Sequence, residues 1–345
     1  MKIIIPVVGF GKAGGERVLS KLATELKNFG HDVVFIAPEH SGEPYYQTSA
    51  TVKYSKFNKQ GSKVARFFSR YFNLWRACLR EKPDAVIANL HLVAYLVALL
   101  PIATSKKFYY IQAYEVMFGQ NNLSRLIAYV TYLLPLRKIV NHKDLLPKKI
   151  NNIEGVVPAG IDLKLFRPEL PVRSEPVRCI GIIGRKERHK GTNETVDLIC
   201  NLKITSNITL NVAIYLSDEN KQKLEKAKIN WNYYDIACDE ELSAFYKRNQ
   251  LVIATGLIED GAFHYPCAEA MACGCLVISN YAPLIDTSSN FSIPTFDSAI
   301  ITTKIEKAFS LKSEELDHEI QQNMLAVSQY SWDVVGRKLN AILHK

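Results

Sequence analysis

A carboxylate near the C-terminal end lies in a sequence that could form a ligand-binding helix. Residues 263–274 read Phe-His-Tyr-Pro-Cys-Ala-Glu-Ala-Met-Ala-Cys-Gly, with Glu269 near the middle. We expect a short apolar helix with Glu269 in its first turn, ended by Gly274 before the apolar run 275–278. Such a carboxylate interacts well with the helix dipole and can accept hydrogen bonds from vicinal ligand hydroxyls at the carboxyl edge of a parallel sheet. The alternative is a well-capped helix with an exposed acid.

A cationic loop is the second candidate site. It follows the apolar run 179–183 and reads Gly-Arg-Lys-Glu-Arg-His-Lys-Gly over residues 184–191. Cations close to a strand end, before a helix N-terminus, can neutralise a diphosphate. The alternative is a basic surface loop. We expect the loop to lie on the same carboxyl edge as Glu269, which favours a ligand site.

A glycine-rich loop near the N-terminus matches the sequence pattern of a dinucleotide-binding site. Residues 9–14 read Gly-Phe-Gly-Lys-Ala-Gly between an expected strand and an expected helix, which matches GxGxxG. That pattern also requires an acid at the end of the second strand, where this chain has Ile-Ala-Pro before Glu39. We therefore expect no nicotinamide or flavin cofactor. A glycine-rich turn at a helix N-terminus still binds an anion, whatever molecule carries it.

Two series of alternating strands and helices position these loops. The expected elements of the first series are strands at 2–8, 32–36, 85–88 and 108–111, with a helix at 16–29. The second series has strands at 178–183, 210–215, 231–236, 251–254 and 276–278, with helices at 192–202 and 239–247. The strands are continuous apolar runs, as expected when helices cover both faces of a sheet. Residues 166–176 hold three prolines and predict a linker. The sequence thus predicts an α/β protein of two Rossmann-like, doubly wound domains facing a central cleft.

Composition narrows the class of protein. A chain of 345 residues is long enough for two domains. Its seven cysteines lack zinc-finger spacing, which indicates reduced thiols in a cytoplasmic protein. No targeting segment is evident, and the apolar stretches 90–103 and 126–136 are unsuited to spanning a bilayer. We expect a cytoplasmic protein that at most lies on a membrane.

The positive charge is concentrated in the first half. Residues 1–160 hold 22 Lys and Arg against 10 Asp and Glu, whereas residues 161–345 hold 21 against 24. Basic and aromatic residues alternate most densely at 53–82, which indicates a basic amphipathic helix. Such a helix could have a solvated basic face, lie at an anionic membrane surface, or bind nucleic acid. We favour the first two and expect no nucleic-acid partner.

Five motifs in this order resemble those of GT-B glycosyltransferases, and in particular the large retaining family GT4. They are Gly-Gly-Glu-Arg at 14–17, Val-Pro-Ala-Gly-Ile-Asp at 157–162, Gly-Arg with Lys-Gly at 184–191, Pro with Glu-Ala-Met-Ala-Cys-Gly at 266–274, and Tyr-Ser-Trp at 330–332. The resemblance covers essentially the whole chain. Residues 109–115 are also similar to a variant seen in bacterial surface-polysaccharide transferases. The resemblance implies an N-terminal acceptor domain at 1–165, a linker at 166–177, a donor domain at 178–328 and a final helix at 329–345 that crosses back to the first domain.

The resemblance implies roles for individual residues. Arg185 and Lys190 would hold the donor diphosphate and stabilise the leaving group, and Glu269 would bind the ribose. With these three as the catalytic set, the donor-binding set would comprise Gly14, Gly15, Gly184, Glu259, Asp260, Phe263, His264 and Tyr265. No cofactor and no metal are implied, and the sequence has no DxD motif to hold a metal. Cations in a closed cleft would neutralise the charge instead.

The sequence departs from the family pattern at two positions. The family usually has a Glu eight residues before Glu269, where this chain has Gly261. Glu259 or Asp260 could substitute for it, or the site could be degenerate. The family often has a His after strand 108–111, where Gln112 stands here. His91 and His264 are alternatives that the sequence does not rank, and Glu115 completes the acceptor and sugar candidates with His91 and Gln112.

Together these features predict a metal-independent, retaining glycosyltransferase. The donor would be a UDP-, GDP- or dTDP-sugar, and the acceptor a glycan or lipid-linked glycan in bacterial surface-polysaccharide synthesis. The enzyme could lie at the inner face of the plasma membrane through residues 53–82. Retention would proceed by front-face attack assisted by the leaving phosphate, without a protein nucleophile. The alternatives are a GT-B sugar-nucleotide epimerase and a catalytically inactive GT-B partner subunit.

Overall fold

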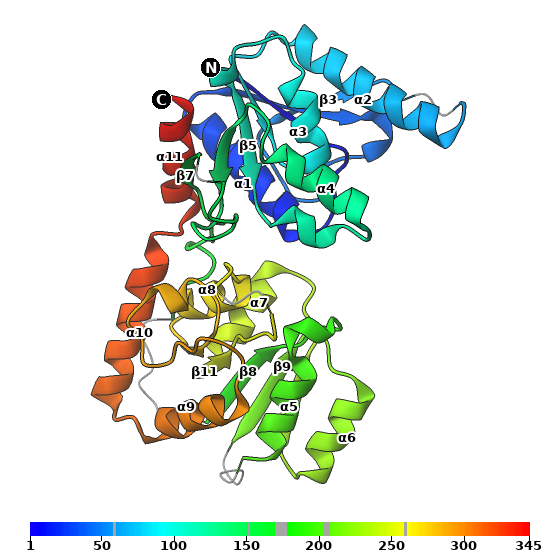
Figure 1. Cartoon of the computed structure of the whole chain (residues 1–345). Coiled ribbons are helices and arrows are strands. Elements are labelled where there is room, and N and C mark those ends of the chain that lie inside the picture. The colour runs from blue at the N-terminus through cyan, green and yellow to red at the C-terminus, as the bar shows by residue number, and fades with distance from the viewer. Residues whose placement is uncertain (58–59, 151, 170–177, 203–207, 259–260) are drawn as a thin grey trace. The chain divides into compact units, whose positions relative to one another are not determined.

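The chain forms two compact units in the computed structural model, which describes residues 1–57, 60–150, 152–169, 178–202, 208–258 and 261–345 (Figure 1). The first unit comprises residues 1–160 and 332–345, and the second comprises residues 161–331. The boundaries expected from the sequence are at 165 and 329. Most of the expected linker, residues 170–177, lies outside the described residues.

The first unit is built on a seven-stranded parallel sheet of order β3-β2-β1-β4-β5-β6-β7. Its strands are β1 (Lys2–Pro6), β2 (Asp32–Pro38), β3 (Thr51–Ser55), β4 (Ala85–Ala88), β5 (Lys107–Ile111), β6 (Arg137–Val140) and β7 (Ile153–Val156). The apolar runs predicted β1, β2, β4 and β5. They did not predict β3, β6 and β7, because β3 and β7 are partly exposed edge strands and β6 starts with two cations.

Helices cover this sheet and leave its carboxyl edge to loops. The helices are α1 (Gly14–Asn28), η1 (Glu39–Ser41), α2 (Lys63–Arg80), α3 (His91–Ala98), η2 (Thr104–Lys106), η3 (Glu115–Phe118), α4 (Asn122–Thr131) and α11 (Trp332–Leu343). One core cluster joins α2 and α3 to the sheet, and it includes Leu74, Val97 and Tyr109. α11 packs against α1 and β7, so the last helix of the chain belongs to the first unit (Figure 1).

The second unit has a five-stranded parallel sheet of order β10-β9-β8-β11-β12. Its strands are β8 (Cys179–Ile183), β9 (Thr209–Ala213), β10 (Asn230–Tyr234), β11 (Leu251–Ile253) and β12 (Leu276–Ile278). Its helices are η4 (Arg188–Lys190), α5 (Thr192–Cys200), α6 (Asp218–Lys226), α7 (Asp239–Lys247), α8 (Tyr265–Ala272), η5 (Leu284–Asp286), α9 (Ser298–Ser310) and α10 (Ser313–Ser328). One core cluster joins the sheet to α5, α6, α9 and α10, and a second cluster joins it to α7 and α8. The predicted α/β fold of two doubly wound sheets is confirmed.

Two expectations, one about the cysteines and one about membrane-spanning helices, can be compared with the structure. All seven cysteines are free, as the sequence predicts. Within the described ranges, no helix combines the length and the apolar character needed to cross a membrane.

Candidate functional site

The strand order of the second unit places two loops of interest at one point of its sheet. β9 and β10 extend the sheet on one side of β8, whereas β11 and β12 extend it on the other. The order therefore reverses between β8 and β11, and doubly wound sheets bind ligands at the carboxyl ends of strands at such a point. The cationic loop 184–191 follows β8, and the chain leading to α8 follows β11. The fold thus brings both predicted sites to one edge.

The cationic loop begins and ends with a glycine, one required by close packing and the other by its backbone conformation. A Cβ on Gly184 would overlap the carbonyl oxygen of Tyr215, so only glycine fits where the loop leaves β8. The backbone N–H of Arg185 donates to Oγ1 of Thr192, over 2.8 Å, which ties the loop to the first turn of α5. Gly191 precedes α5 with φ of 70°, a left-handed conformation that favours glycine. The loop therefore presents Arg185 and Lys190 beside a helix N-terminus, where anions bind well.

Glu269 is buried, so the alternative of an exposed acid on α8 is wrong. The prediction of a first-turn carboxylate is wrong, because α8 begins at Tyr265 and its first turn holds no acid. Only 1% of Glu269 is exposed, and the hydroxyl of Tyr246 on α7 donates to its Oε2 over 3.1 Å. Burial first, and then the Glu269 carboxylate, raise the pKa of Tyr246 well above its ordinary value. Tyr246 therefore stays protonated and keeps its hydroxyl as a donor to Glu269.

His264 connects the two loops electrostatically. It directly precedes α8, and its ring packs on Tyr281 with ring centroids 4.4 Å apart. The Nζ of Lys190 lies 6.0 Å from the centre of the same Tyr281 ring. Burial first, and then the positive charges of Lys190 and Arg185, lower the pKa of His264 to about 3. His264 is thus neutral at physiological pH, and its Nδ1 is a buried atom without a hydrogen-bond partner in the described ranges.

Backbone hydrogen bonds hold the chain that leads to α8 against the segment after β12. The N–H of Gly261 donates to the carbonyl of Asn280, and the N–H of His264 donates to that of Ala282. Gly261 has φ of 83°, so the glutamate that the family usually has here would be strained. Glu259 and Asp260, the proposed substitutes, lie outside the described residues.

The aromatic donor candidates lie beside His264. The rings of Phe263 and Tyr265 contact each other edge to face, with centroids 5.3 Å apart. Phe263 also contacts Tyr330 at 5.5 Å. The second unit thus gathers two cations, a neutral histidine, a buried carboxylate and an aromatic pair. Within the described ranges, no group of three His, Cys, Asp or Glu side chains is arranged to hold a metal.

The first unit has an equivalent edge, where Gly14 and Gly15 start α1. Nε2 of Gln112 donates to the carbonyl of Gly15 over 3.1 Å, and Nδ2 of Asn141 donates to the carbonyl of Gln112 over 2.6 Å. The three loops after β1, β5 and β6 are therefore linked. Glu39 lies beyond β2, where its Oε2 accepts the N–H of Phe57. It is thus engaged with the chain's own backbone.

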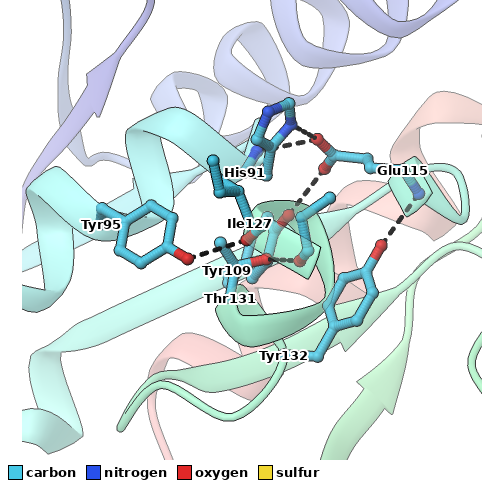
Figure 2. A network of polar contacts seen from close by, with 8 residues as sticks. His91, Tyr95, Tyr109, Glu115, Ile127, Thr131 and Tyr132 are labelled. Atoms are coloured by element: carbon cyan, nitrogen blue, oxygen red, sulfur yellow. Dashed lines mark hydrogen bonds and ion pairs between the residues drawn. The ribbon is translucent and has the colours of Figure 1, made fainter. Parts of the chain in front are cut away.

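His91 and Glu115 form a pair on this edge (Figure 2). Nδ1 of His91 lies 2.6 Å from Oε2 of Glu115, and the hydroxyl of Tyr109 donates to Oε1 over 2.7 Å. The backbone N–H of Glu115 donates to the hydroxyl oxygen of Tyr132 over 2.9 Å. Of the three acceptor candidates, the structure thus joins His91 to Glu115 and places Gln112 at the glycine turn instead.

The tyrosines that contact these groups were not predicted from the sequence. Tyr246 donates to Glu269, the ring of Tyr281 lies close to both His264 and Lys190, and Tyr109 and Tyr132 hold Glu115. Tyr109 alone had a signal, since a polar hydroxyl in a buried strand needs a partner. The others become visible only when the helices are packed.

Comparisons with known proteins agree with this architecture. Residues 13–110 match the family model for Glycosyltransferase Family 4. A search of curated proteins by sequence found no match. A glycosyltransferase from Rickettsia africae is similar in structure, with a TM-score of 0.77 and 17% identity over 99% of this chain and 97% of that one. The lipopolysaccharide outer core galactosyltransferase WaaB is similar with a TM-score of 0.74 and 14% identity, over 100% of this chain and 99% of that one. HepE of Anabaena, crystallised with UDP and glucose, is similar with a TM-score of 0.70 and 12% identity over the whole of both chains.

The predicted resemblance is therefore confirmed at two levels. The chain has the GT-B fold over its whole length, as its structural neighbours do. Its N-terminal segment matches the GT4 family model. Fold and family match together support a transferase.

Proposed function

We propose that this protein is a retaining, metal-independent glycosyltransferase that takes its sugar from a nucleotide-sugar donor. The observation that carries the proposal is the cluster of Arg185, Lys190 and His264 at the point where the strand order of the second unit reverses. Burial is the main cause of the low pKa of His264, and the charges of Lys190 and Arg185 lower this pKa further. Such a positive field is suited to a diphosphate and to the charge that develops on it as the glycosidic bond breaks.

The donor and its handling form the finer part of the proposal. HepE is crystallised with UDP and with UDP-glucose, which supports a nucleoside diphosphate as the group bound here. Glu269 would accept hydrogen bonds from the ribose, while its Oε2 also accepts the hydroxyl of Tyr246. Arg185 and Lys190 would supply the charge neutralisation, so no metal and no cofactor enter the proposal.

A thermal-shift screen against UDP, GDP, dTDP, ADP, CMP and NAD⁺ tests the donor class. A ligand at about 100 times its Kd stabilises the native state by about 2.7 kcal/mol, which raises the midpoint by about 5–10 °C for a unit of this size. A shift with one nucleoside diphosphate supports the proposal and identifies the base. A shift with NAD⁺ alone would instead support a dinucleotide site at residues 9–14, and no shift at all would contradict nucleotide-sugar transfer.

We also propose that the acceptor lies at an anionic membrane surface, as expected for a lipid-linked glycan at the inner face of the plasma membrane. α2 buries only Leu74 and Cys78, and its exposed side chains include both cations and large apolar groups. The exposed apolar residues of α2 are Val64, Phe67, Phe68 and Phe72. α2 has no Asp or Glu. A simple solvated face does not require exposed phenylalanines, whereas interfacial helices combine apolar and basic groups in this way.

A second helix of the first unit, α4, also has exposed apolar residues and a cation. α3 contacts both α2 and α4 (Figure 1). The exposed apolar residues of η3 and α4 are Met117, Phe118, Leu123, Leu126 and Ile127. α4 also lacks acidic residues and carries Arg125. α2 and α4, each in contact with α3, thus both present exposed apolar and basic side chains.

Co-sedimentation with lipid vesicles tests the membrane proposal. We expect binding to phosphatidylglycerol vesicles that salt weakens, and little binding to phosphatidylcholine. The double variant Phe68→Ser and Phe72→Ser should lose binding, whereas the control Leu325→Ser, at an exposed site on α10, should retain it. Equal binding by both variants would contradict the proposal. Displacement of the protein from vesicles by duplex DNA would favour the nucleic-acid alternative.

One observation favours an inactive partner subunit as the second candidate function. The left-handed backbone at Gly261 makes a glutamate unfavourable at the position where the family usually has one. Nucleotide binding without turnover of any nucleotide sugar would support that candidate. Release of free nucleoside diphosphate from a sugar donor would exclude it.

A further inference from the structure

A groove of the first unit has no part in the sites described above. Its walls are α1, the loop 43–50 and the edge strand β3, and its volume is about 710 Å³. Sites for small organic ligands usually have about 300–1,000 Å³. The groove is therefore large enough to hold such a ligand.

Hydrogen bonds hold the walls of this groove in place. The backbone N–H of Ser49 donates to Oγ1 of Thr24 over 3.0 Å, which ties the loop to α1. The hydroxyl of Tyr54 on β3 lies 3.1 Å from the carbonyl oxygen of Gly42 and 3.1 Å from Oε1 of Glu43. The loop is thus attached to both of the other walls, and the groove is pre-formed, as ligand sites usually are.

The groove lies on the face of the sheet opposite to α2. Successive side chains of a strand point to opposite faces. Nζ of Lys53 lies 2.7 Å from Oε1 of Glu81, the residue that follows α2, so Lys53 points to the α2 side. Val52 and Tyr54, its neighbours in β3, therefore point to the other face, where they line the groove. The groove is thus separate from the basic and apolar surface of α2.

The lining residues determine the class of ligand that the groove suits. Their charged members are one cation, Lys21, and one anion, Glu43, so the lining has no net charge and does not favour a phosphate or an anionic lipid. Only Pro44, Ala50 and Val52 are apolar, which is too few for an acyl chain. The remaining members have hydroxyl or amide groups, which suits a neutral ligand with many hydroxyls. They are Thr24, Tyr46, Gln47, Thr48, Ser49 and Tyr54.

The groove also offers an aromatic ring and polar groups that are available to a ligand. Tyr54 is 39% exposed, although its hydroxyl is held by the loop. The face of an aromatic ring is electronegative, so it attracts the C–H groups of a sugar ring. Lys21 and Gln47 make no hydrogen bond or ion pair with other described residues, so both can bond to sugar hydroxyls. Stacking and polar contacts are thus available side by side.

The groove adjoins the glycine loop of residues 9–14. The hydroxyl of Tyr46 donates to the carbonyl of Lys12 over 2.8 Å, and Nζ of Lys12 lies 4.9 Å from the ring centre of Tyr45. A ligand in the groove can therefore extend to the carboxyl edge of this sheet, where doubly wound domains bind ligands. We propose that the groove binds a neutral oligosaccharide, as a subsite for the part of the acceptor glycan that does not react. The acceptor role rests on the proposed glycosyl transfer, whereas binding of the saccharide does not.

Saturation-transfer NMR on the full chain without nucleotide tests the binding. The probes are neutral oligosaccharides of glucose, galactose, mannose and N-acetylglucosamine, and we expect at least one to bind. Tyr54→Ala should weaken this binding by about 3- to 10-fold, because it removes the aromatic contact. The control Tyr233→Ala should leave it unchanged, since Tyr233 is a 43% exposed tyrosine on β10, the edge strand of the other sheet. No binding of any probe, or equal binding by Tyr54→Ala and the wild type, would overturn the proposal.

A second variant keeps the test valid if Tyr54→Ala fails to fold. Gln47 is exposed, so Gln47→Ala leaves the loop contacts in place, and it should weaken binding by about 2- to 10-fold through the loss of a hydrogen bond. A heparin hexasaccharide serves as the anionic probe. If it bound more tightly than the neutral probes and Gln47→Ala weakened its binding, the assignment to a neutral ligand would be wrong.

Transfer kinetics test the acceptor role separately from binding. The donor is the nucleotide sugar that the thermal-shift screen selects, and the acceptor is the oligosaccharide that binds most tightly. Gln47→Ala should raise the KM for this acceptor by about 2- to 10-fold, as it weakens binding. An unchanged KM, or no transfer to this acceptor, would remove the acceptor role. Saccharide binding without any nucleotide binding would remove the proposed transfer but not the saccharide site, whereas nucleotide binding without saccharide binding would remove only this inference.

Discussion

Replacing His264 by glutamine should remove part of the acid sensitivity of the second unit. Burial, and then Lys190 and Arg185, lower the pKa of His264 from an ordinary 6.5 to about 3. Between these two values the unfolded chain binds a proton at His264 and the folded chain does not. Stability therefore falls as pH drops through 6.5, and the loss grows until the folded form also becomes protonated near pH 3.

The size of the effect follows from the linkage between protonation and folding. Each pH unit below the unfolded pKa costs about 1.36 kcal/mol while the folded form stays neutral. At pH 5 the loss is therefore about 2 kcal/mol relative to pH 7. The figure depends only on the unfolded pKa as long as the folded pKa stays well below 5. For a protein with about 5–15 kcal/mol of stability, this is a measurable fraction.

Urea unfolding at pH 7 and pH 5 measures this effect. Trp231 is the one tryptophan of the second unit, so in a Trp75→Phe and Trp332→Phe background its fluorescence reports the relevant transition. The drop in the free energy of unfolding between the two pH values should be about 2 kcal/mol smaller in His264→Gln than in the wild type. The control His318→Gln, at an exposed site on α10, should leave the drop unchanged. An equal drop in His264→Gln and the wild type would refute the neutral state of His264.

Three further substitutions test the site of the second unit. Lys190→Ala should lower turnover in steady-state kinetics by about 10²- to 10³-fold, because it removes charge stabilisation of the leaving group. In urea unfolding it should change the free energy of unfolding by less than about 0.5 kcal/mol. Glu269→Gln should weaken UDP binding by about 1.5–3 kcal/mol in calorimetry, the value of hydrogen bonds to a charged group, and unchanged affinity would contradict the ribose role. Gly184→Ala should destabilise the protein by about 1–3 kcal/mol in urea unfolding, since its Cβ overlaps the carbonyl of Tyr215, whereas the control Gly9→Ala, which meets only one atom at 4.0 Å, should have little effect on stability.

Local patterns were sufficient for the strands that are buried on both faces. β4 and β12 begin and end at the predicted residues, because continuous apolar runs bounded by turns define such strands. β3 and β6 escaped prediction for opposite reasons. β3 is a half-exposed edge strand, and β6 begins with Arg137 and Lys138, whose charges conceal a strand that lies inside the sheet.

The sequence by itself determined the fold class, the two glycine-bounded loops and the helix that carries Glu269, because each depends on residues close together in the chain. Only the tertiary structure decided what those groups do. The buried carboxylate of Glu269 has a hydrogen-bond donor because Tyr246, 23 residues earlier, lies beside it, and His91 is oriented because Glu115, 24 residues later, holds its Nδ1. The pKa of His264 depends on burial and on Lys190 and Arg185 of a distant loop. Hydrogen bonds and electrostatic effects act over a few ångströms in space, and the packing of parallel strands, whose order differs from their order in the chain, determines which residues come that close.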